Sequence, residues 1–364
     1  MRSNSDLALV KRIAPSKVIE HARERTVYWH GLEPDHCSAI HFAHLPTIEN
    51  MSISSTAQTT STNLARLAAL LERVSPATRP NTVFADVDDS FWFWANTEGL
   101  RVSQGLRQIL PSLPSDEIQT NFTGASGDAT LAQAFAAYQL FKELYELEGK
   151  RLTPSSRLLD YGCGWGRIIR FFLKEIEPSN LLGIDCYEEI IQICKETNRW
   201  CRFLTVDPLP PTALSGRTFD LIYCFSVFSH LSETAHREWL GEFLRLLKPG
   251  GLLIATTRAR DFIERCAELR RKSDIPGHQA GPAHAFKDSE SALDDYDNGR
   301  YCYSPVGGGG VLDPSFFGET CIPKSYVMEH WTRSFDFVDF IEDRNRCPQN
   351  VIAVKKPLKL NRAK

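Results

Sequence analysis

The chain has 364 residues and a net charge of −3, with 42% hydrophobic and 24% charged residues, as in ordinary globular proteins. This slightly acidic balance offers no general attraction for nucleic acid, so we expect no nucleic-acid partner. No apolar run reaches the length of about eighteen residues that a membrane helix needs, and residues 1–30 lack the apolar segment of a secretion signal. The ten cysteines form no C-x-x-C pair, which favours reduced thiols in a cytoplasmic protein without a membrane partner.

Residues 1–62 are expected to be disordered or a dispensable extension. They hold a cluster of histidines, and Cys37, His41 and His44 could share one helix face as metal ligands. Flanking prolines interrupt any long helix there and no second ligand cluster balances them, so we expect no metal. A Ser/Thr-rich stretch ends this region and begins after Met51, where we expect the native chain to start.

Residues 63–150 are predicted to form a helical N-terminal and lid region. Apolar residues recur at helical spacing over 64–75 and again, more strongly, over 128–147. Between them, "DVDDS" presents Asp86 and Asp88 in the spacing of a metal site. The favoured interpretation is that an acidic or serine side chain of this stretch caps the following aromatic helix.

Residues 151–257 change pattern, because short apolar strands alternate with amphipathic helices, which predicts a parallel, doubly wound sheet. The expected strands are 156–162, 180–185, 202–207, 219–227 and 250–257, and the expected helices are 166–178, 188–200 and 233–247. Residues 258–325 interrupt this pattern and are expected to cap the substrate. Residues 326–357 are predicted to supply a closing helix and two antiparallel strands.

The stretch "LLDYGCGWGR" at 158–167 predicts a strand that runs into a cofactor-binding glycine loop. It lacks the lysine and hydroxyl residue of a P-loop, and Arg167 stands where a dinucleotide fingerprint has its third glycine. The pattern is instead D-x-G-x-G-x-G from Asp160 to Gly166. A carboxylate at the strand tip repels a pyrophosphate and favours a cation, which S-adenosylmethionine supplies as an ammonium and a sulfonium.

Two further acids end the next two strands of the predicted sheet. Asp185 stands where an acid accepts hydrogen bonds from ribose hydroxyls. Asp207 is placed to accept a hydrogen bond from the adenine amino group, and Cys186 to pack against adenine. Three acids at successive strand ends make an S-adenosylmethionine site a more specific interpretation than any one of them does.

From about 155 to 257 the chain resembles class I S-adenosylmethionine-dependent methyltransferases of the bacterial "methyltransferase domain" type. The resemblance rests on "LLDYGCGWGR", "LLGID", "TVD", "FDLIYCFSVFSHL" and "LKPGGLLIATT". It implies an α/β, Rossmann-like seven-stranded sheet with helices on both faces and its last strand antiparallel, plus the helical N-terminal segment and an insertion after the fifth strand. The cofactor-binding residues that it implies are Asp160, Gly162, Cys163, Gly164, Gly166, Asp185, Cys186, Asp207, Phe225 and Ser226, with Thr123 and Gly124 in a lid.

Catalysis is predicted to use His230 as a base, because ligands of such sheets bind at the carboxyl ends of the strands. Tyr301, Tyr303, His278 and His284 in the insertion are further candidates for contact with the acceptor, and "GGGG" at 307–310 is either a lid hinge or a flexible loop.

The acceptor is expected to be a small or medium molecule, a saccharide or natural product, methylated on a hydroxyl or amine. Methyltransferases of base nitrogens carry an Asn/Asp-Pro-Pro-aromatic signature after the fourth strand, where this chain reads "CFSV". Two alternatives stay open: a catalytically degenerate module that binds S-adenosylmethionine, and an NAD-dependent oxidoreductase. The sequence does not predict an oligomeric state.

Overall fold

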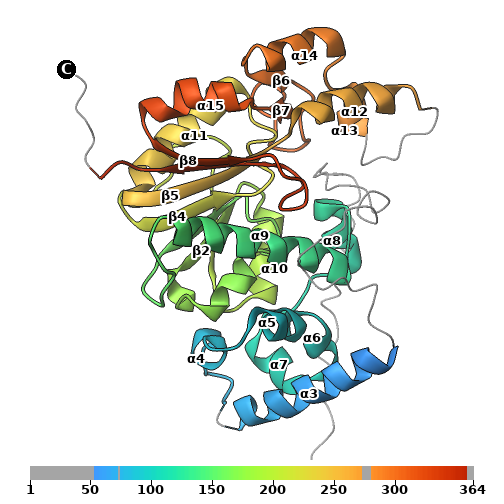
Figure 1. Ribbon diagram of the computed structural model, residues 1–364, viewed down its shortest axis with the longest axis vertical. Coiled ribbons are helices and arrows are strands. Elements are labelled where there is room, and N and C mark those ends of the chain that lie inside the picture. Colours follow the sequence, from blue (N-terminus) through green and yellow to red (C-terminus); the bar gives the residue numbers. More distant parts are fainter. Residues whose placement is uncertain (1–52, 73, 273–279, 359–364) are drawn as a thin grey trace, which may run out of the picture.

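The computed structural model describes residues 53–72, 74–272 and 280–358, which centre on one seven-stranded sheet (Figure 1). Its strands are Leu158–Tyr161 (β1), Leu181–Asp185 (β2), Arg202–Thr205 (β3), Phe219–Cys224 (β4), Leu247–Thr257 (β5), Asp336–Ile341 (β8) and Asn350–Lys355 (β9). The spatial order is β3-β2-β1-β4-β5-β9-β8. β1 to β5 pair in parallel, whereas β9 runs antiparallel between β5 and β8. The predicted sheet with its antiparallel last strand is confirmed.

Alternate residues of the strands pack toward opposite faces of the sheet. In β1, Leu158 belongs to the apolar cluster that contains Phe141, whereas Leu159 belongs to the cluster that contains Trp239 and Trp331. Figure 1 shows α9 (Gly127–Leu147) and α10 (Glu188–Thr197) on one face, and α11 (Glu233–Leu246) and α15 (Lys324–His330) on the other. Burial on both faces is what allows the central strands to be continuous apolar runs.

The segment after the glycine loop differs from its prediction. In place of the α-helix expected over 166–178, the chain forms a 3₁₀ helix, η2 (Ile169–Lys174), followed by a short turn, η3 (Pro178–Asn180). Every residue of η2 is buried, including Arg170, because the segment lies against α9 and β2 as well as the N-terminal helices. A 3₁₀ helix is narrower than an α-helix. Because the aromatic and β-branched residues of this segment are buried on all sides, it lacks the solvent-exposed face of an amphipathic α-helix.

The N-terminal region is helical as predicted and lies at the blue end of the molecule in Figure 1. Its helices are Ile53–Leu71 (α3), Pro80–Phe84 (α4), Asp89–Asn96 (α5), Glu98–Val102 (α6), Gln104–Ile109 (α7) and Asp116–Thr123 (α8). Because α3 begins at Ile53, residues 53–62 are helical rather than disordered, while the alternative that residues 1–62 are dispensable stays a prediction. Serine and threonine lower the stability of a helix only slightly. The apolar end of α3 is anchored, because Leu67 is buried in the core. The predicted start at Met51 and the possible metal ligands Cys37, His41 and His44 lie outside the described residues.

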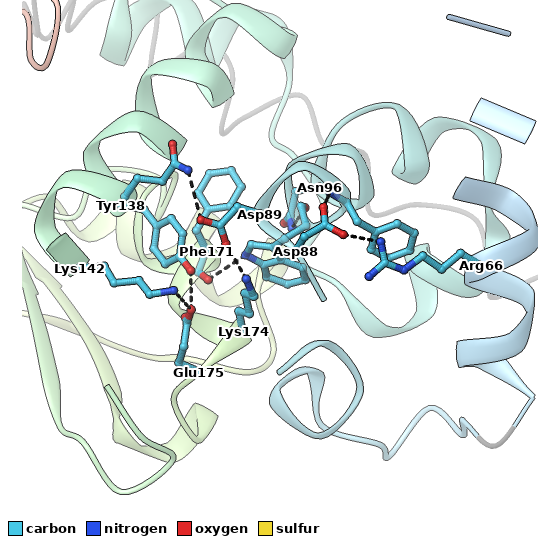
Figure 2. A network of polar contacts seen from close by, with 12 residues as sticks. Arg66, Asp88, Asp89, Asn96, Tyr138, Lys142, Phe171, Lys174 and Glu175 are labelled. Atoms are coloured by element: carbon cyan, nitrogen blue, oxygen red, sulfur yellow. Dashed lines mark hydrogen bonds and ion pairs between the residues drawn. The ribbon is translucent and has the colours of Figure 1, made fainter. Parts of the chain in front are cut away.

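A polar network fixes this region to the core (Figure 2). Lys174 of η2 donates to Asp89 at 2.5 Å, and Glu175 accepts from Tyr138 at 2.6 Å and from Lys142 at 2.9 Å. Asp88 caps α5 by accepting from the Phe91 amide at 2.8 Å. The capping interpretation of the "DVDDS" stretch is therefore confirmed.

The insertion between β5 and α15 folds as a small helical unit with its own two-stranded sheet, at the upper right of Figure 1. It comprises Arg260–Arg270 (α12), Ala280–His284 (α13), Ser289–Asp297 (α14), Cys302–Ser304 (β6) and Glu319–Cys321 (β7), with β6 and β7 antiparallel. The 3₁₀ turn η5 (Trp331–Arg333) follows α15 and leads into β8. Among the residues described, no helix combines the length and the apolar character needed to cross a bilayer.

Candidate active site

Two cavities open near the carboxyl ends of β1, β4 and β5. We call the first the cofactor pocket; it is narrow, with a volume of about 60 Å³. Its walls come from the glycine loop, from α8 and α9, and from the segments that follow β4, β5 and β8. The residues are Phe122, Thr123, Gln133, Asp160, Gly162, Cys163, Gly164, Trp165, Arg167, Ile168, Phe225, Ser226, Arg258, Pro348 and Gln349.

Asp160 supplies the acidic group of the cofactor pocket. Its carboxylate is buried at the end of β1 and accepts a hydrogen bond from the Tyr223 hydroxyl at 2.7 Å. Burial raises the pKa of Asp160 to about 7; the charge of Asp185 adds to this rise, whereas the Tyr223 hydrogen bond and the charge of Arg167 oppose it. A cationic ligand group beside Asp160 would restore the ionised form, because an opposite charge favours it. The site therefore fits an ammonium better than a phosphate.

Glycine is required in the loop for two separate reasons. Gly162 and Gly164 have φ values of +69° and +50°, in the region where side chains are strained. In addition, a Cβ on Gly162 would lie 2.4 Å from a methyl group of Val227, whereas one on Gly164 would meet nothing nearer than Phe122 at 3.8 Å. The loop backbone consequently packs closely on the segment after β4.

Asp185 holds the loop in this conformation. One carboxylate oxygen accepts from the Gly164 amide at 3.0 Å and the other from the Tyr187 amide at 3.1 Å. The carboxylate is buried, and burial raises its pKa although these backbone hydrogen bonds oppose the rise. Asp185 thus joins the end of β2 to the glycine loop.

The structure brings most of the predicted cofactor residues together, but not all. Asp160, Gly162, Cys163, Gly164, Phe225, Ser226 and Thr123 line the cofactor pocket. Gly166, Asp185, Cys186, Asp207 and Gly124 do not line it. Gly124 instead ends α8 in the left-handed conformation, and Asp207 lies past the end of β3. A role in cofactor binding stays a prediction for all of these residues.

Several pocket residues were missed by the sequence prediction. The guanidinium of Arg167 donates to Gln133 of α9 at 2.5 Å and lies over the Phe225 ring at 5.1 Å. Gln349 accepts from Thr256 at 2.6 Å and donates to the Ser226 hydroxyl at 2.9 Å. Arg167 directly follows the glycine motif and could have been found from that position. Gln349 sits in the turn between the last two strands, where no motif marks it.

The other space, which we call the second cavity, has a volume of about 660 Å³ and lies between the segment after β4 and the insertion. Its lining residues are His230, Gly281, His284, Lys287, Ser304, Pro305, Val306, Gly307, Phe317, Gly318 and Glu319. Its volume falls within the range of about 300–1,000 Å³ typical of small-molecule sites.

His230 lines the second cavity rather than the cofactor pocket. Its ring is buried, stacks on Phe317 with 4.9 Å between centroids, and has Nδ1 2.8 Å from the Gly318 carbonyl oxygen. A carbonyl only accepts, so Nδ1 carries the proton and Nε2 is the basic nitrogen of the neutral ring. This arrangement fixes the ring, and its Nε2 atom is buried as well.

One ion pair separates the two cavities. Arg258 at the end of β5 lines the cofactor pocket, and its Nε lies 3.4 Å from Glu319, which lines the second cavity. The Glu319 carboxylate is also 3.7 Å from His230 Nδ1. Burial raises the pKa of Glu319 to about 7, against the opposing charge and hydrogen bond of Arg258. A titratable carboxyl group therefore faces the second cavity directly behind the cofactor pocket.

The other predicted acceptor residues have different positions. His284 lines the second cavity. The hydroxyls of Tyr301 and Tyr303 instead donate to the carbonyl oxygens of Leu231 at 2.9 Å and of Pro314 at 2.7 Å, and His278 lies outside the described residues.

The "GGGG" segment is hydrogen-bonded through its backbone to the rest of the insertion and to Tyr187 beyond β2, and its role as a lid hinge or a flexible loop stays a prediction. The Gly308 amide donates to Leu312 at 3.0 Å, and the Gly309 carbonyl accepts from the Tyr187 hydroxyl at 2.8 Å. Tyr187 lies two residues after Asp185, so this hydrogen bond joins the segment to the turn after β2.

The segment that carries the glycine loop and most of the parallel strands matches a known protein family. Residues 159–253 match the family described as "Methyltransferase domain". These residues carry a methyltransferase domain of the class I S-adenosylmethionine-dependent kind. S-adenosylmethionine is therefore the cofactor, and the NAD-dependent alternative is not retained.

Individual relatives of this methyltransferase are distant. An rRNA N(6)-adenosine-methyltransferase of Caenorhabditis elegans is 26% identical over 38% of the chain and 72% of its own length. A malonyl-[acyl-carrier protein] O-methyltransferase of Pectobacterium atrosepticum is 25% identical over 40% of the chain, which spans only 59% of that relative. A solved S-adenosylmethionine-dependent methyltransferase of Mesorhizobium loti aligns with a TM-score of 0.40 at 12% identity, covering 61% of this chain and 98% of that one. These relatives come from an animal and from two bacteria, and the bacterial type of the domain stays a prediction.

Among the residues described, no group of three or more histidine, cysteine, aspartate or glutamate side chains could hold a metal ion. The cysteines described are free thiols, and all but Cys186 are buried.

Proposed function

We propose that this methyltransferase transfers a methyl group from S-adenosylmethionine to a hydroxyl or amine of a small or medium, non-nucleic acceptor, such as a saccharide or natural product. The observation that supports this proposal is the second cavity, whose wall is shared with the cofactor pocket through Arg258 and Glu319. A cavity of about 660 Å³ suits a small molecule.

The roles of the residues follow from their positions. Asp160 would hold the ammonium of the cofactor, Asp185 the glycine loop and the ribose, and Asp207 the adenine. The cofactor supplies a methyl group on a sulfonium, so the protein has to hold the acceptor atom in line at attack distance. His230 would accept the proton of the acceptor hydroxyl or amine at Nε2, because its Nδ1 proton is held by the Gly318 carbonyl.

RNA is the competing class of acceptor, because the Caenorhabditis elegans relative is named as acting on rRNA. The net charge of −3 gives no general attraction to phosphates, and the chain lacks the Asn/Asp-Pro-Pro-aromatic signature after β4. These observations favour a small acceptor.

The test has two stages on the full chain. Calorimetry should detect binding of S-adenosylmethionine and S-adenosylhomocysteine, and none of NAD. Formation of S-adenosylhomocysteine is then measured with a small-molecule metabolite pool and, separately, with total RNA. Turnover with the metabolite pool alone supports the proposal, whereas turnover with RNA alone replaces the acceptor class. Cofactor binding without turnover in either pool would favour the alternative of a catalytically degenerate binding module.

His230→Gln tests the base. We expect kcat to fall by about 10²-fold, because a positioned base contributes about 10²–10⁴-fold, while cofactor affinity stays unchanged. Unchanged turnover would remove His230 from the chemistry.

A further inference from the structure

The residues of the second cavity divide into a buried end and an exposed rim. His230, Phe317 and Glu319 are each at most 3% exposed. His284 and Lys287 are exposed and line the same cavity at its surface. The cavity is therefore polar at both ends, with its aromatic wall at the buried end.

The charges at the two ends differ. At the rim, Lys287 is a cation. The neighbouring Asp288 is not among the lining residues; its carboxylate caps α14 by accepting from the Ser291 amide at 3.0 Å and keeps its charge there. At the buried end, the charge of Glu319 is balanced by Arg258. Among the residues described, the lining thus carries a cation at the rim and a paired carboxyl group at the buried end.

An acceptor that fills this cavity needs two groups at opposite ends. Its nucleophile has to reach the buried end, because the wall formed by Glu319 and Arg258 is the side that borders the cofactor pocket. Its other end then lies beside Lys287 and His284, where an anion gains favourable charge interactions and an uncharged group does not.

We propose that the acceptor is a small organic anion whose carboxylate or phosphate group binds Lys287 and His284 while its hydroxyl or amine faces His230 and Glu319. This inference rests on the proposed function and specifies its acceptor class. It also predicts that acceptor recognition and cofactor binding depend on different residues.

The test uses the full chain saturated with S-adenosylhomocysteine and three probes of similar shape: benzoate, phenyl phosphate and benzyl alcohol. Dissociation constants are measured by ligand-observed NMR. We expect the better of the two anions to bind at least tenfold more tightly than the uncharged alcohol, and the choice between them distinguishes a carboxylate from a phosphate group. Lys287→Glu should remove this preference, while its binding of benzyl alcohol stays within twofold of that of the unmodified chain.

The matched control is Lys324→Glu, because Lys324 is also an exposed lysine but lies on α15 away from the lining residues. It should leave the binding of all three probes unchanged. Equal binding of anions and alcohol, no binding of any probe, or equal losses in the two variants would each overturn the inference. Calorimetry of S-adenosylhomocysteine on the same samples keeps the two proposals apart, since a failure of the cofactor to bind would count against the proposed function instead.

Discussion

The cofactor pocket and the second cavity are built in different ways. The cofactor pocket is formed around backbone: a glycine loop packed on Val227, held by Asp185, with a volume of about 60 Å³. The second cavity is formed by side chains of the insertion and of the segment after β4, and its volume is about 660 Å³. A volume of about 60 Å³ is below the range of small-molecule sites, so the proposed binding of the cofactor there requires wall side chains such as Phe122 and Arg167 to move. The second cavity is already within that range. The difference in construction also explains why a sequence motif marks the first site and none marks the second.

The largest effect is expected from Gly162→Ala, which tests how tightly the cofactor loop is packed. The new Cβ would lie 2.4 Å from Val227, in a residue with φ of +69°. Backbone strain and overpacking together should lower the free energy of unfolding by about 2–5 kcal/mol, measured by urea denaturation.

Gly164→Ala is the matched control for this prediction. Its φ is +50°, but the nearest atom to its Cβ is 3.8 Å away, so only the backbone strain of about 1–2 kcal/mol should remain. Adding Val227→Ala to Gly162→Ala should cost less than the sum of the single changes. Equal losses in the two alanine variants would show that the close contact with Val227 does not limit the loop.

Asp160→Asn tests whether charge, rather than shape, selects the cofactor. The amide can still accept from Tyr223, but it cannot pair with an ammonium, so S-adenosylmethionine affinity should fall by about 1.5–3 kcal/mol, or roughly 10- to 150-fold, by calorimetry.

The pH dependence sharpens the Asp160 test. The pKa of Asp160 is raised by burial to about 7, so the unmodified protein should gain affinity as the carboxyl loses its proton between pH 6 and 7.5. The Asn variant should show no such gain, and a parallel gain in both would refute the assignment of Asp160 to the ammonium.

The same contrast explains what could be predicted from the sequence. Strand ends and glycine positions are set by local pattern, so the sheet, Asp160 and the glycine loop were all found. The second cavity depends on residues far apart in the chain, such as His230 and Glu319, which only the folded insertion brings together. Glu319 carries no local signal, since it lies in a three-residue strand inside an irregular segment.

One error has a similar cause. The segment Ile169–Lys174 has the apolar residues of a helix, but burial on every side leaves it as a 3₁₀ helix, and periodicity alone does not distinguish the two. Tyr301 and Tyr303 were candidates for contact with the acceptor because they lie in the insertion. Both hydroxyls donate to backbone carbonyls, and their contact with an acceptor stays a prediction.

Glu319→Gln tests the wall between the two cavities. The folded-state pKa of Glu319 is about 7, above its ordinary 4.5, because burial disfavours the charged form. The folded protein therefore keeps a proton that the unfolded chain has released, and stability is lost as pH rises from about 4.5 to 7. Relative to the Gln variant, the unmodified protein should lose about 1–2 kcal/mol of unfolding free energy between pH 5 and pH 8. If the two proteins differ in unfolding free energy by the same amount at pH 5 and at pH 8, Arg258 keeps Glu319 ionised throughout that range.

The smallest effect is expected from Asp207→Asn, at the outer edge of the cofactor side. Asp207 is exposed beyond β3 and does not line the cofactor pocket, so it can contribute at most one solvent-screened hydrogen bond to adenine. S-adenosylmethionine affinity should fall by about 0.5–1 kcal/mol, or two- to fivefold, by calorimetry, with no change in the free energy of unfolding. A loss as large as that of Asp160→Asn would show that the pocket opens far enough on cofactor entry to enclose Asp207. In that case the cofactor pocket would be narrower than the second cavity only while the cofactor is absent.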